Sequence, residues 1–253
     1  MFPIIQIGPM AIQAPGIILL IGLWLGLILA ERLAPRFQVN PNHIYNLIFV
    51  ALISGLIGAR LSFVVQNRDV FLLSPLNVFS LNPGLLDPIG GVAFGLIAAL
   101  VYGNRKKIAW WPTLDAITPF LGVMIIAFGF SNLASGDGFG AETSLPWGVE
   151  LWGLRRHPTQ IYQILMGFII LGIIWLRTNN SKKVQRKSGE TFVGFIALSA
   201  GAWLFIEAFR GDSVVLSNGV RTAQIAAWLV LLISLWGFGK LHQRAEDDNS
   251  RIM

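Results

Sequence analysis

The chain has 253 residues, of which 54% are hydrophobic and only 13% are charged, and its mean hydropathy is +0.64. This balance excludes a soluble domain, because too little polar surface is left to cover one. The formal charge of +6 does not indicate a nucleic-acid-binding protein, since Lys and Arg occur in short clusters between apolar runs. The absence of cysteine leaves the chain with neither a disulfide nor a thiol nucleophile of its own.

The apolar runs predict an all-α integral membrane protein, a single transmembrane domain over residues 1–253 with seven spans. A spanning helix needs about 20 mostly apolar residues, and the third run, which is rich in glycine, is the shortest candidate. In chain order, the predicted spans are Ala14 to Ala30, Tyr45 to Val65, Pro88 to Tyr102, Pro112 to Leu133, Pro158 to Leu176, Glu190 to Phe209 and Val220 to Gly239.

The distribution of basic residues predicts the orientation, because cytoplasmic connections carry an excess of Lys and Arg. Most of the 19 Lys and Arg residues follow the first, third, fifth and seventh spans, and they include the basic loop 177–189. The opposite connections contain only Arg68, Arg155, Arg156, Arg210 and Arg221. We therefore expect the amino terminus outside and the carboxyl terminus in the cytoplasm.

With this orientation, the polar residues within and beside the spans gather near the outer face. Arg60, Ser131, Asn132, Glu207 and Arg210 lie at outward ends of spans, His157, Gln160, Tyr162 and Gln224 at inward starts, and Asp137, Glu142, Glu150, Arg155 and Arg156 in the outer loop 134–157. An ionisable group within a span costs at least about 2.5 kcal/mol, so it normally has a partner or a function. Arginines at headgroup depth indicate a phosphate ester as ligand.

Purely structural interpretations of the same residues remain open. Arg60 and Glu207 can form an interhelical ion pair, and His157-Pro158 can be only a helix start with the imidazole as a cap. Asp115 is compatible with a first-turn acid favoured by the helix dipole.

The glycines allow similar alternatives. Gly90, Gly91 and the glycines of SGDGFG are more typical of close helix packing and turns than of a phosphate cradle. No metal site is expected, because His43, His157 and His242 are scattered along the chain.

Several segments together resemble the prolipoprotein diacylglyceryl transferase family, of which the chain would be a divergent or degenerate member. The resemblance covers the whole chain, and the most specific segment is RHPTQIYQ around His157. The others are QIGPMAIQAPG, GARLSFV around Arg60, GGVAFG around Gly91, SNLASGDGFG around Asn132, IEAFRGD around Glu207 and AQI around Gln224.

The resemblance implies a multi-pass enzyme of the bacterial cytoplasmic membrane that transfers diacylglyceryl from phosphatidylglycerol to the lipobox cysteine of a preprolipoprotein. It implies no cofactor. The implied catalytic residues are His157, Glu207 and Arg210. The implied substrate- or lipid-binding residues are Arg60, Asn132, Asp137, Arg155, Arg156, Gln160, Tyr162 and Gln224.

Four departures from the family pattern leave catalysis open. The pattern has a tyrosine at Pro15, a histidine at Gly95, and arginines at Gly129 and Trp203. Loss of one preorganised donor costs roughly 3 to 4 kcal/mol of transition-state stabilisation. Arg155, Arg156 and Arg221 are candidates to replace the missing guanidiniums. The alternative is a noncatalytic descendant that binds phospholipid as a scaffold or as a subunit of a larger membrane complex. A transporter is disfavoured because no internal repeat is present.

Overall fold

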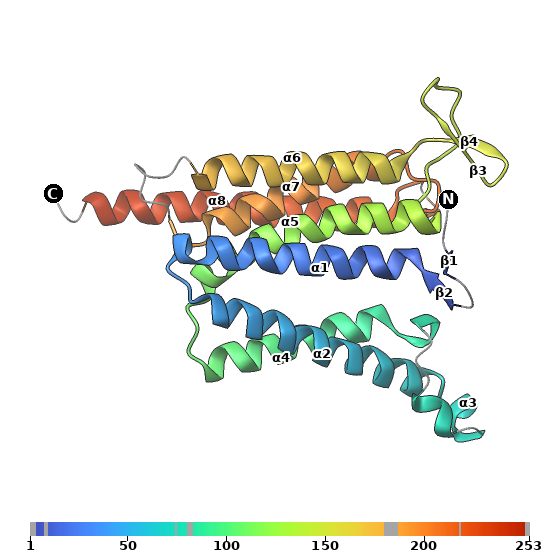
Figure 1. Ribbon diagram of the computed structural model, residues 1–253. Helices are drawn as coiled ribbons and strands as arrows, with labels where there is room; N and C mark the ends of the chain where they lie inside the picture. Colours follow the sequence, from blue (N-terminus) through green and yellow to red (C-terminus); the bar gives the residue numbers. More distant parts are fainter. Residues whose placement is uncertain are drawn as a thin grey trace.

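The computed structural model describes residues 4–7, 10–73, 75–79, 83–179, 187–217 and 219–250. Its long helices lie side by side (Figure 1), and six helical segments of this described part are long and apolar enough to cross a membrane. The long helices are α1 (Ala14–Leu33), α2 (Pro41–Gln66), α4 (Pro88–Arg105), α5 (Trp110–Ser135), α6 (Thr159–Asn179), α7 (Glu190–Glu207) and α8 (Thr222–Ser250). The predicted helical membrane protein is confirmed at this level.

Helix α4 is the predicted span that is not among these six segments. It has 18 residues and is apolar over most of its length, but its last turn contains Asn104 and Arg105. These two polar residues lower the mean hydropathy of the helix. The glycine-rich run is helical, as predicted.

Short elements cluster at one end of the bundle, which we call the hairpin end. They include hairpin β1 (Ile4–Ile7) with β2 (Met10–Gln13), hairpin β3 (Val149–Leu151) with β4 (Leu154–Arg156), and helix α3 (Arg68–Leu73). Figure 1 shows all of them at the end opposite the carboxyl terminus. The 3₁₀ helices are η1 (Ala34–Phe37), η2 (Pro75–Phe79) and η3 (Pro83–Leu85). Residues 180–186 of the predicted basic loop lie outside the described residues.

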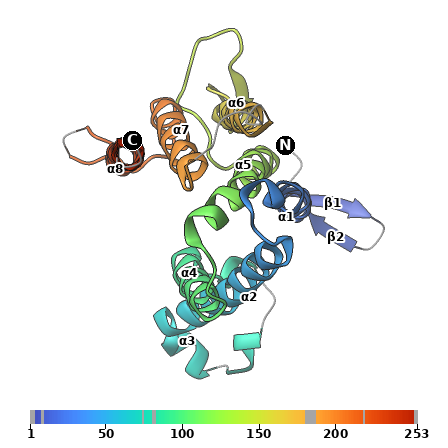
Figure 2. The same cartoon turned by 90° about the vertical axis from the view of Figure 1, so that its left-hand side faces the viewer.

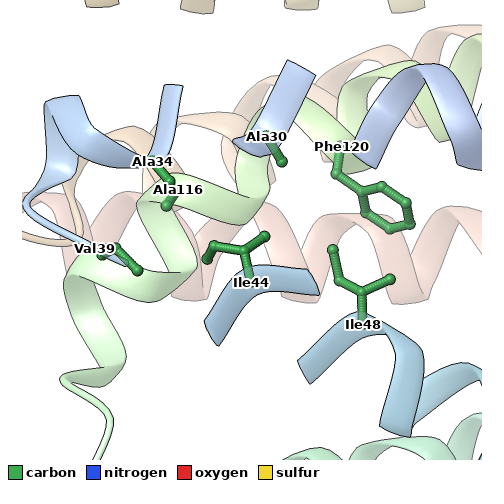
Figure 3. Packing of buried hydrophobic residues seen from close by; sticks show 7 residues of the cluster. All are labelled: Ala30, Ala34, Val39, Ile44, Ile48, Ala116 and Phe120. Atoms are coloured by element: carbon green, nitrogen blue, oxygen red, sulfur yellow. The ribbon is translucent and has the colours of Figure 1, made fainter. Parts of the chain in front are cut away.

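Helices α1 and α5 form the centre of the bundle, between the α2–α4 pair and the group α6–α8 (Figure 2). Glycine permits the close approach of α1 to α5, because a Cβ on Gly22 would lie 2.2 Å from the Cβ of Ala127. A buried cluster links α1, η1, α2 and α5 (Figure 3); its members are Ala30, Ala34, Val39, Ile44, Ile48, Ala116 and Phe120. A second cluster joins α6 and α7 through Ile170, Ile174 and Phe195.

Helices α2 and α4 pack backbone to backbone through small residues. A Cβ on Gly91 would lie 3.1 Å from the carbonyl oxygen of Gly55, and one on Gly90 would lie 2.2 Å from the Cβ of Ser62. The interpretation of Gly90 and Gly91 as packing residues is confirmed. The glycine at position 95 has the same use, since its Cβ would lie 2.9 Å from the carbonyl oxygen of Ala51.

Asp115 caps a helix other than its own. Helix α5 begins at Trp110, so Asp115 is not in its first turn, and the first-turn interpretation is wrong. Its buried carboxylate accepts hydrogen bonds from the backbone N–H groups of Gly189 at 2.6 Å and Phe192 at 2.8 Å. These N–H groups belong to the start of α7, whose own N-cap residue, Gly189, offers no side chain. Asp115 therefore joins α5 to α7 at the end opposite the hairpins.

Candidate functional site

The segment that follows α5 turns sharply at two glycines. Gly136 ends the helix with φ +89°, and its N–H donates to the carbonyl oxygen of Asn132 at 2.8 Å. Gly138 follows with φ +62°. Both conformations are left-handed and suit glycine, so the sequence SGDGFG forms turns, as predicted. The reversal brings residues 137–142 back over the hairpin end of the bundle.

The first turn of α6 holds this segment in place. The hydroxyl of Thr159 donates to the carbonyl oxygen of Gly138 at 2.6 Å, and the side-chain amide of Gln160 donates to that of Asp137 at 2.9 Å. Thr159 is 1% and Gln160 3% exposed. Because Pro158 precedes α6, the polar side chains at positions 159 and 160 are fixed at the very start of the helix.

The chain after α7 pairs with the opposite edge of the same segment. The N–H of Ala141 donates to the carbonyl oxygen of Phe209 at 2.7 Å, and the N–H of Gly211 donates to that of Phe139 at 2.8 Å. The His157 N–H also donates to the carbonyl oxygen of Ala141 at 3.0 Å. Three segments far apart in the sequence, SNLASGDGFG, RHPTQIYQ and IEAFRGD, are thus brought together at one place, which we call the junction.

Arg210 is the cation at this junction. Its Nε and Nη2 each lie 2.8 Å from an oxygen of Asp212, and Nε lies 3.8 Å from Oε2 of Glu207. The hydrogen bonds and charge of Asp212 raise the pKa of Arg210 against the opposing effect of burial. Burial alone would raise the pKa of Asp212, but Arg210 lowers it below its usual value. The guanidinium also lies 5.5 Å from the ring centroid of Trp203.

Glu207 is the most deeply buried charged group of the junction, at 2% exposure. Its Oε2 accepts no hydrogen bond from the described residues, while its backbone carbonyl accepts one from Nη1 of Arg221. A buried carboxylate oxygen without a donor is costly, so it is a natural position for a hydroxyl or N–H of a ligand. In the described part of the chain, no side-chain ion pair joins Glu207 to Arg221; the ion pair of Glu207 is with Arg210.

A small pocket adjoins the junction and combines polar and apolar walls. Its lining residues are Leu133, Val149, Leu151, Arg156, His157, Pro158 and Gln160. Arg156 donates from Nη1 to the carbonyl oxygen of Gly140 at 3.3 Å and stacks over Phe139 at 4.9 Å. Its buried Nε has no acceptor among the described residues. Arg156 therefore lines the pocket and retains one guanidinium N–H without an acceptor.

His157 belongs to an aromatic cluster at the edge of this pocket. Its Nδ1 lies 3.3 Å from the hydroxyl of Tyr162, which also accepts a hydrogen bond from Nε1 of Trp147 at 3.0 Å. The rings of His157 and Phe209 lie 5.0 Å apart between centroids. The imidazole thus bonds Tyr162, one turn into α6, and the proposed role as a helix cap has no support from the described hydrogen bonds.

The remaining predicted residues surround the junction or lie apart from it. The side-chain amide of Asn132 lies beside Gly138, and Asp137 is exposed but supplies its carbonyl to Gln160. Gln224 lies half-buried in the first turn of α8. Arg155 is exposed, and its Nη2 donates to the carbonyl oxygen of Pro146 at 2.8 Å within the β3–β4 segment.

Arg60 lies in a different place, near the hairpin end of α2. Its guanidinium donates to the carbonyl oxygens of Val78 and Leu85 at 2.8 Å each, and to that of Asn77. These carbonyls belong to the connection between α2 and α4. The pairing of Arg60 with Glu207 considered above is not formed, because each side chain has local partners instead.

Three of the four departures occupy packed or hydrogen-bonded positions, and the fourth, Trp203, is 38% exposed beside the Arg210 guanidinium. A Cβ on Gly129 would lie 2.7 Å from Cγ1 of Ile164, so α5 meets α6 where the family pattern has an arginine. Gly95 faces α2 in the same way. The carbonyl oxygen of Pro15 accepts a hydrogen bond from Ser131 at 3.3 Å. No group of three or more metal-ligating side chains occurs in the described ranges.

Sequence reasoning missed three residues of the site. Asp212, Thr159 and Trp147 make hydrogen bonds that fix Arg210, the turn at Gly138 and Tyr162 respectively. Asp212 and Thr159 lie inside the resembling segments IEAFRGD and RHPTQIYQ, so their positions carried a signal. Trp147 carried none, because a tryptophan beside a predicted span is typical of an interfacial anchor.

Comparison with known proteins gives a consistent result over most of the chain. Residues 3–239 match the sequence model of the prolipoprotein diacylglyceryl transferase family. The chain is 31% identical over 212 residues to a phosphatidylglycerol–prolipoprotein diacylglyceryl transferase of Clostridioides difficile, covering 83% of each chain. It is 28% identical over 255 residues to a protein of the same name from Trichormus variabilis, covering 95% of this chain and 89% of the relative.

Proposed function

We propose that this chain, which belongs to the prolipoprotein diacylglyceryl transferase family, transfers a diacylglyceryl group from phosphatidylglycerol to the cysteine thiol of a preprolipoprotein. The convergence of SNLASGDGFG, RHPTQIYQ and IEAFRGD at the hairpin end is the observation that carries the proposal. It surrounds a small pocket with Arg156, His157 and Gln160, beside Arg210 and Glu207. The names of the relatives supply the two substrates.

The reaction needs positive groups on the phosphate more than it needs a nucleophile from the protein. The thiol sulfur bonds to the glyceryl carbon as the carbon–oxygen bond to phosphate breaks. The phosphate leaves with the electron pair as glycerol phosphate, and the thiol proton ends on it. Arg156 and Arg210 stabilise the charge of the departing phosphate. Glu207 accepts a headgroup hydroxyl at its unpartnered oxygen, while Asn132 and Gln224 orient the headgroup.

The proposal includes a topology of seven spans with the hairpin end outside, in the bacterial cytoplasmic membrane. Helix α4 packs against α2, and its 18 residues extend about 27 Å, close to the roughly 30 Å of a hydrocarbon core. The cysteine-free chain permits a direct test. Ser217→Cys should react with an impermeant maleimide added outside intact cells, and Asn104→Cys should not; the reverse pattern contradicts the orientation.

A second function, noncatalytic phospholipid binding within a membrane scaffold or complex, is favoured by one specific observation. Gly129 and Gly95 lie against neighbouring helices, so the arginine and histidine of the family pattern have been replaced by close packing. Arg210 is also already engaged by Asp212. A protein of this kind keeps the headgroup site and lacks part of the charge that stabilises the leaving phosphate.

The test is transfer of labelled diacylglycerol from phosphatidylglycerol to a lipobox peptide by the purified protein. The wild type should form product, and Arg210→Ala should lower the rate by a hundredfold or more, as expected for loss of one preorganised cation. Arg68→Ala is the matched control, because this arginine lies outside the pocket, is 80% exposed and pairs with the exposed Asp69. Bound phosphatidylglycerol without product would favour the second function, and neither binding nor product would contradict both.

A further inference from the structure

We propose that Trp147 and Tyr162 hold His157 as the neutral tautomer with its proton on Nε2, so that His157 donates a hydrogen bond to the headgroup phosphate instead of removing the thiol proton. The inference rests on the proposed function for its substrate, but not for the tautomer itself. It assigns Trp147 and Tyr162 as positioning residues. It also decides between two possible roles of His157 in the transfer, a base for the thiol and a contact to the headgroup.

The direction of the hydrogen bonds follows from the chemistry of their donors. An indole N–H can only donate, so the Tyr162 oxygen must accept from Nε1 of Trp147 across 3.0 Å. The hydroxyl proton of Tyr162 then needs an acceptor. Among the described residues, Nδ1 of His157, 3.3 Å away, is the acceptor within hydrogen-bond distance of the Tyr162 hydroxyl. A neutral imidazole that accepts at Nδ1 carries its proton on Nε2.

Packing keeps the ring in this orientation. His157 lies 5.0 Å from Phe209 and 6.2 Å from Tyr162 between ring centroids, and Phe209 and Tyr162 lie 5.9 Å apart. Its backbone is bonded on both sides, through its N–H to Ala141 and through its carbonyl to the N–H of Thr159. Rotation of the ring by half a turn would replace Nδ1 with a carbon and leave the Tyr162 proton without its partner.

The surroundings favour an anionic ligand that only accepts hydrogen bonds. His157 lines the pocket with Arg156 and Gln160. Arg156 Nε has no acceptor among the described residues, and the side-chain amide of Gln160 already donates to the carbonyl oxygen of Asp137. A phosphate diester has acceptors and no N–H or O–H of its own. Because His157 and Arg156 line the same pocket, an Nε2–H on His157 would match a phosphate held there, whereas a bare Nε2 would match a thiol.

Nitrogen-15 spectra of histidine-labelled protein test the tautomer without any transfer assay. The His43→Gln and His242→Gln background leaves His157 as the sole histidine. At pH 8 we expect a pyrrole-type shift at Nε2 and a pyridine-type shift at Nδ1. Tyr162→Phe and Trp147→Phe should move both shifts toward each other as the second tautomer appears, and Trp152→Phe, an exposed tryptophan of the same loop, should not. A proton on Nδ1 in the wild type, or a Tyr162→Phe spectrum identical to it, would overturn the proposal.

A substitution series separates the donor from a base in the reaction. Glutamine places an amide N–H close to the position of Nε2 but cannot accept a proton there. His157→Gln should therefore retain transfer to within about tenfold of the wild type, while His157→Ala falls by about a hundredfold or more. Equal losses in both variants would overturn the donor role. A wild type that transfers nothing would refute the proposed function, and the spectra would still decide the tautomer.

Discussion

The junction formed by SNLASGDGFG, RHPTQIYQ and IEAFRGD and the α2–α4 pair both have arginines at the hairpin end, but these arginines have different partners. In the α2–α4 pair, the Arg60 guanidinium donates hydrogen bonds to three carbonyl oxygens of the connection between the two helices. In the junction, polar groups of one segment hydrogen-bond to another, and Arg156 Nε and Glu207 Oε2 each lack a hydrogen-bond partner among the described residues. The comparison teaches that depth in the membrane does not assign a role to an arginine; its unsatisfied hydrogen-bonding capacity does.

Loss of Arg210 should have the largest effect on the junction. Arg210→Ala leaves the 2%-exposed Glu207 without the guanidinium that lies 3.8 Å from its Oε2. Breaking a fully buried pair costs about 3–5 kcal/mol, and because Arg210 is 22% exposed the loss should lie near the lower end of that range. The midpoint of thermal unfolding in detergent measures the loss. The double variant Arg210→Ala/Glu207→Gln should regain part of it, because the buried charge is gone. An equal or larger loss in the double variant would show that Glu207 is not destabilised by standing alone.

Gly129→Ala tests whether the departure from the family pattern is fixed by packing. The new Cβ would lie 2.7 Å from Cγ1 of Ile164, and such overpacking costs about 1–3 kcal/mol. Gly172→Ala in α6 is the matched control, since nothing lies within 4 Å of a Cβ there. Thermal unfolding of the two variants provides the comparison. If Gly129→Ala is as harmless as Gly172→Ala, α5 and α6 leave room for the missing arginine.

Arg60→Gln should loosen the α2–α4 connection alone. Glutamine cannot make all of these hydrogen bonds, and the net loss of one is worth about 1.5–3 kcal/mol, so amide exchange in residues 76–79 and 84–87 should accelerate by about tenfold or more. Mass spectrometry of exchanged peptides measures this rate. Exchange in residues 136–142 should not change, and Arg68→Gln, whose side chain is 80% exposed, should affect neither region. Acceleration at residues 136–142 would mean that the two regions are coupled.

The smallest expected effect is the acid dependence of the junction. Because Arg210 lowers the pKa of Asp212, the contribution of this carboxylate is complete above the unfolded value of about 3.9. It is lost as the pH falls from there through the lower folded pKa. Its size is at most about 1 kcal/mol, since Asp212 is partly exposed. Asp212→Asn should flatten the thermal stability below pH 4 relative to Asp69→Asn, an exposed control; identical slopes would contradict the pairing.

Sequence patterns located the helices and the junction for physical reasons that can be named. Long apolar runs require helices in lipid, and RHPTQIYQ and IEAFRGD carry several polar residues at fixed spacing beside such runs. The partners of Arg60 could not be predicted in this way, because η2 and η3 are short turns without a periodic signal. Likewise, no local pattern indicates that Asp115 caps α7, since its partner N–H groups lie 74 and 77 residues away.

The most direct measurement is the location of a bound headgroup. Phosphatidylglycerol with a photoreactive group on its headgroup glycerol would be bound to the purified protein, irradiated and mapped by mass spectrometry of the resulting peptides. We expect adducts in residues 132–142, 155–163 and 207–212, reduced in Arg210→Ala. Adducts concentrated in residues 60–95, and unchanged in that variant, would contradict the proposed site and would place it in the α2–α4 pair.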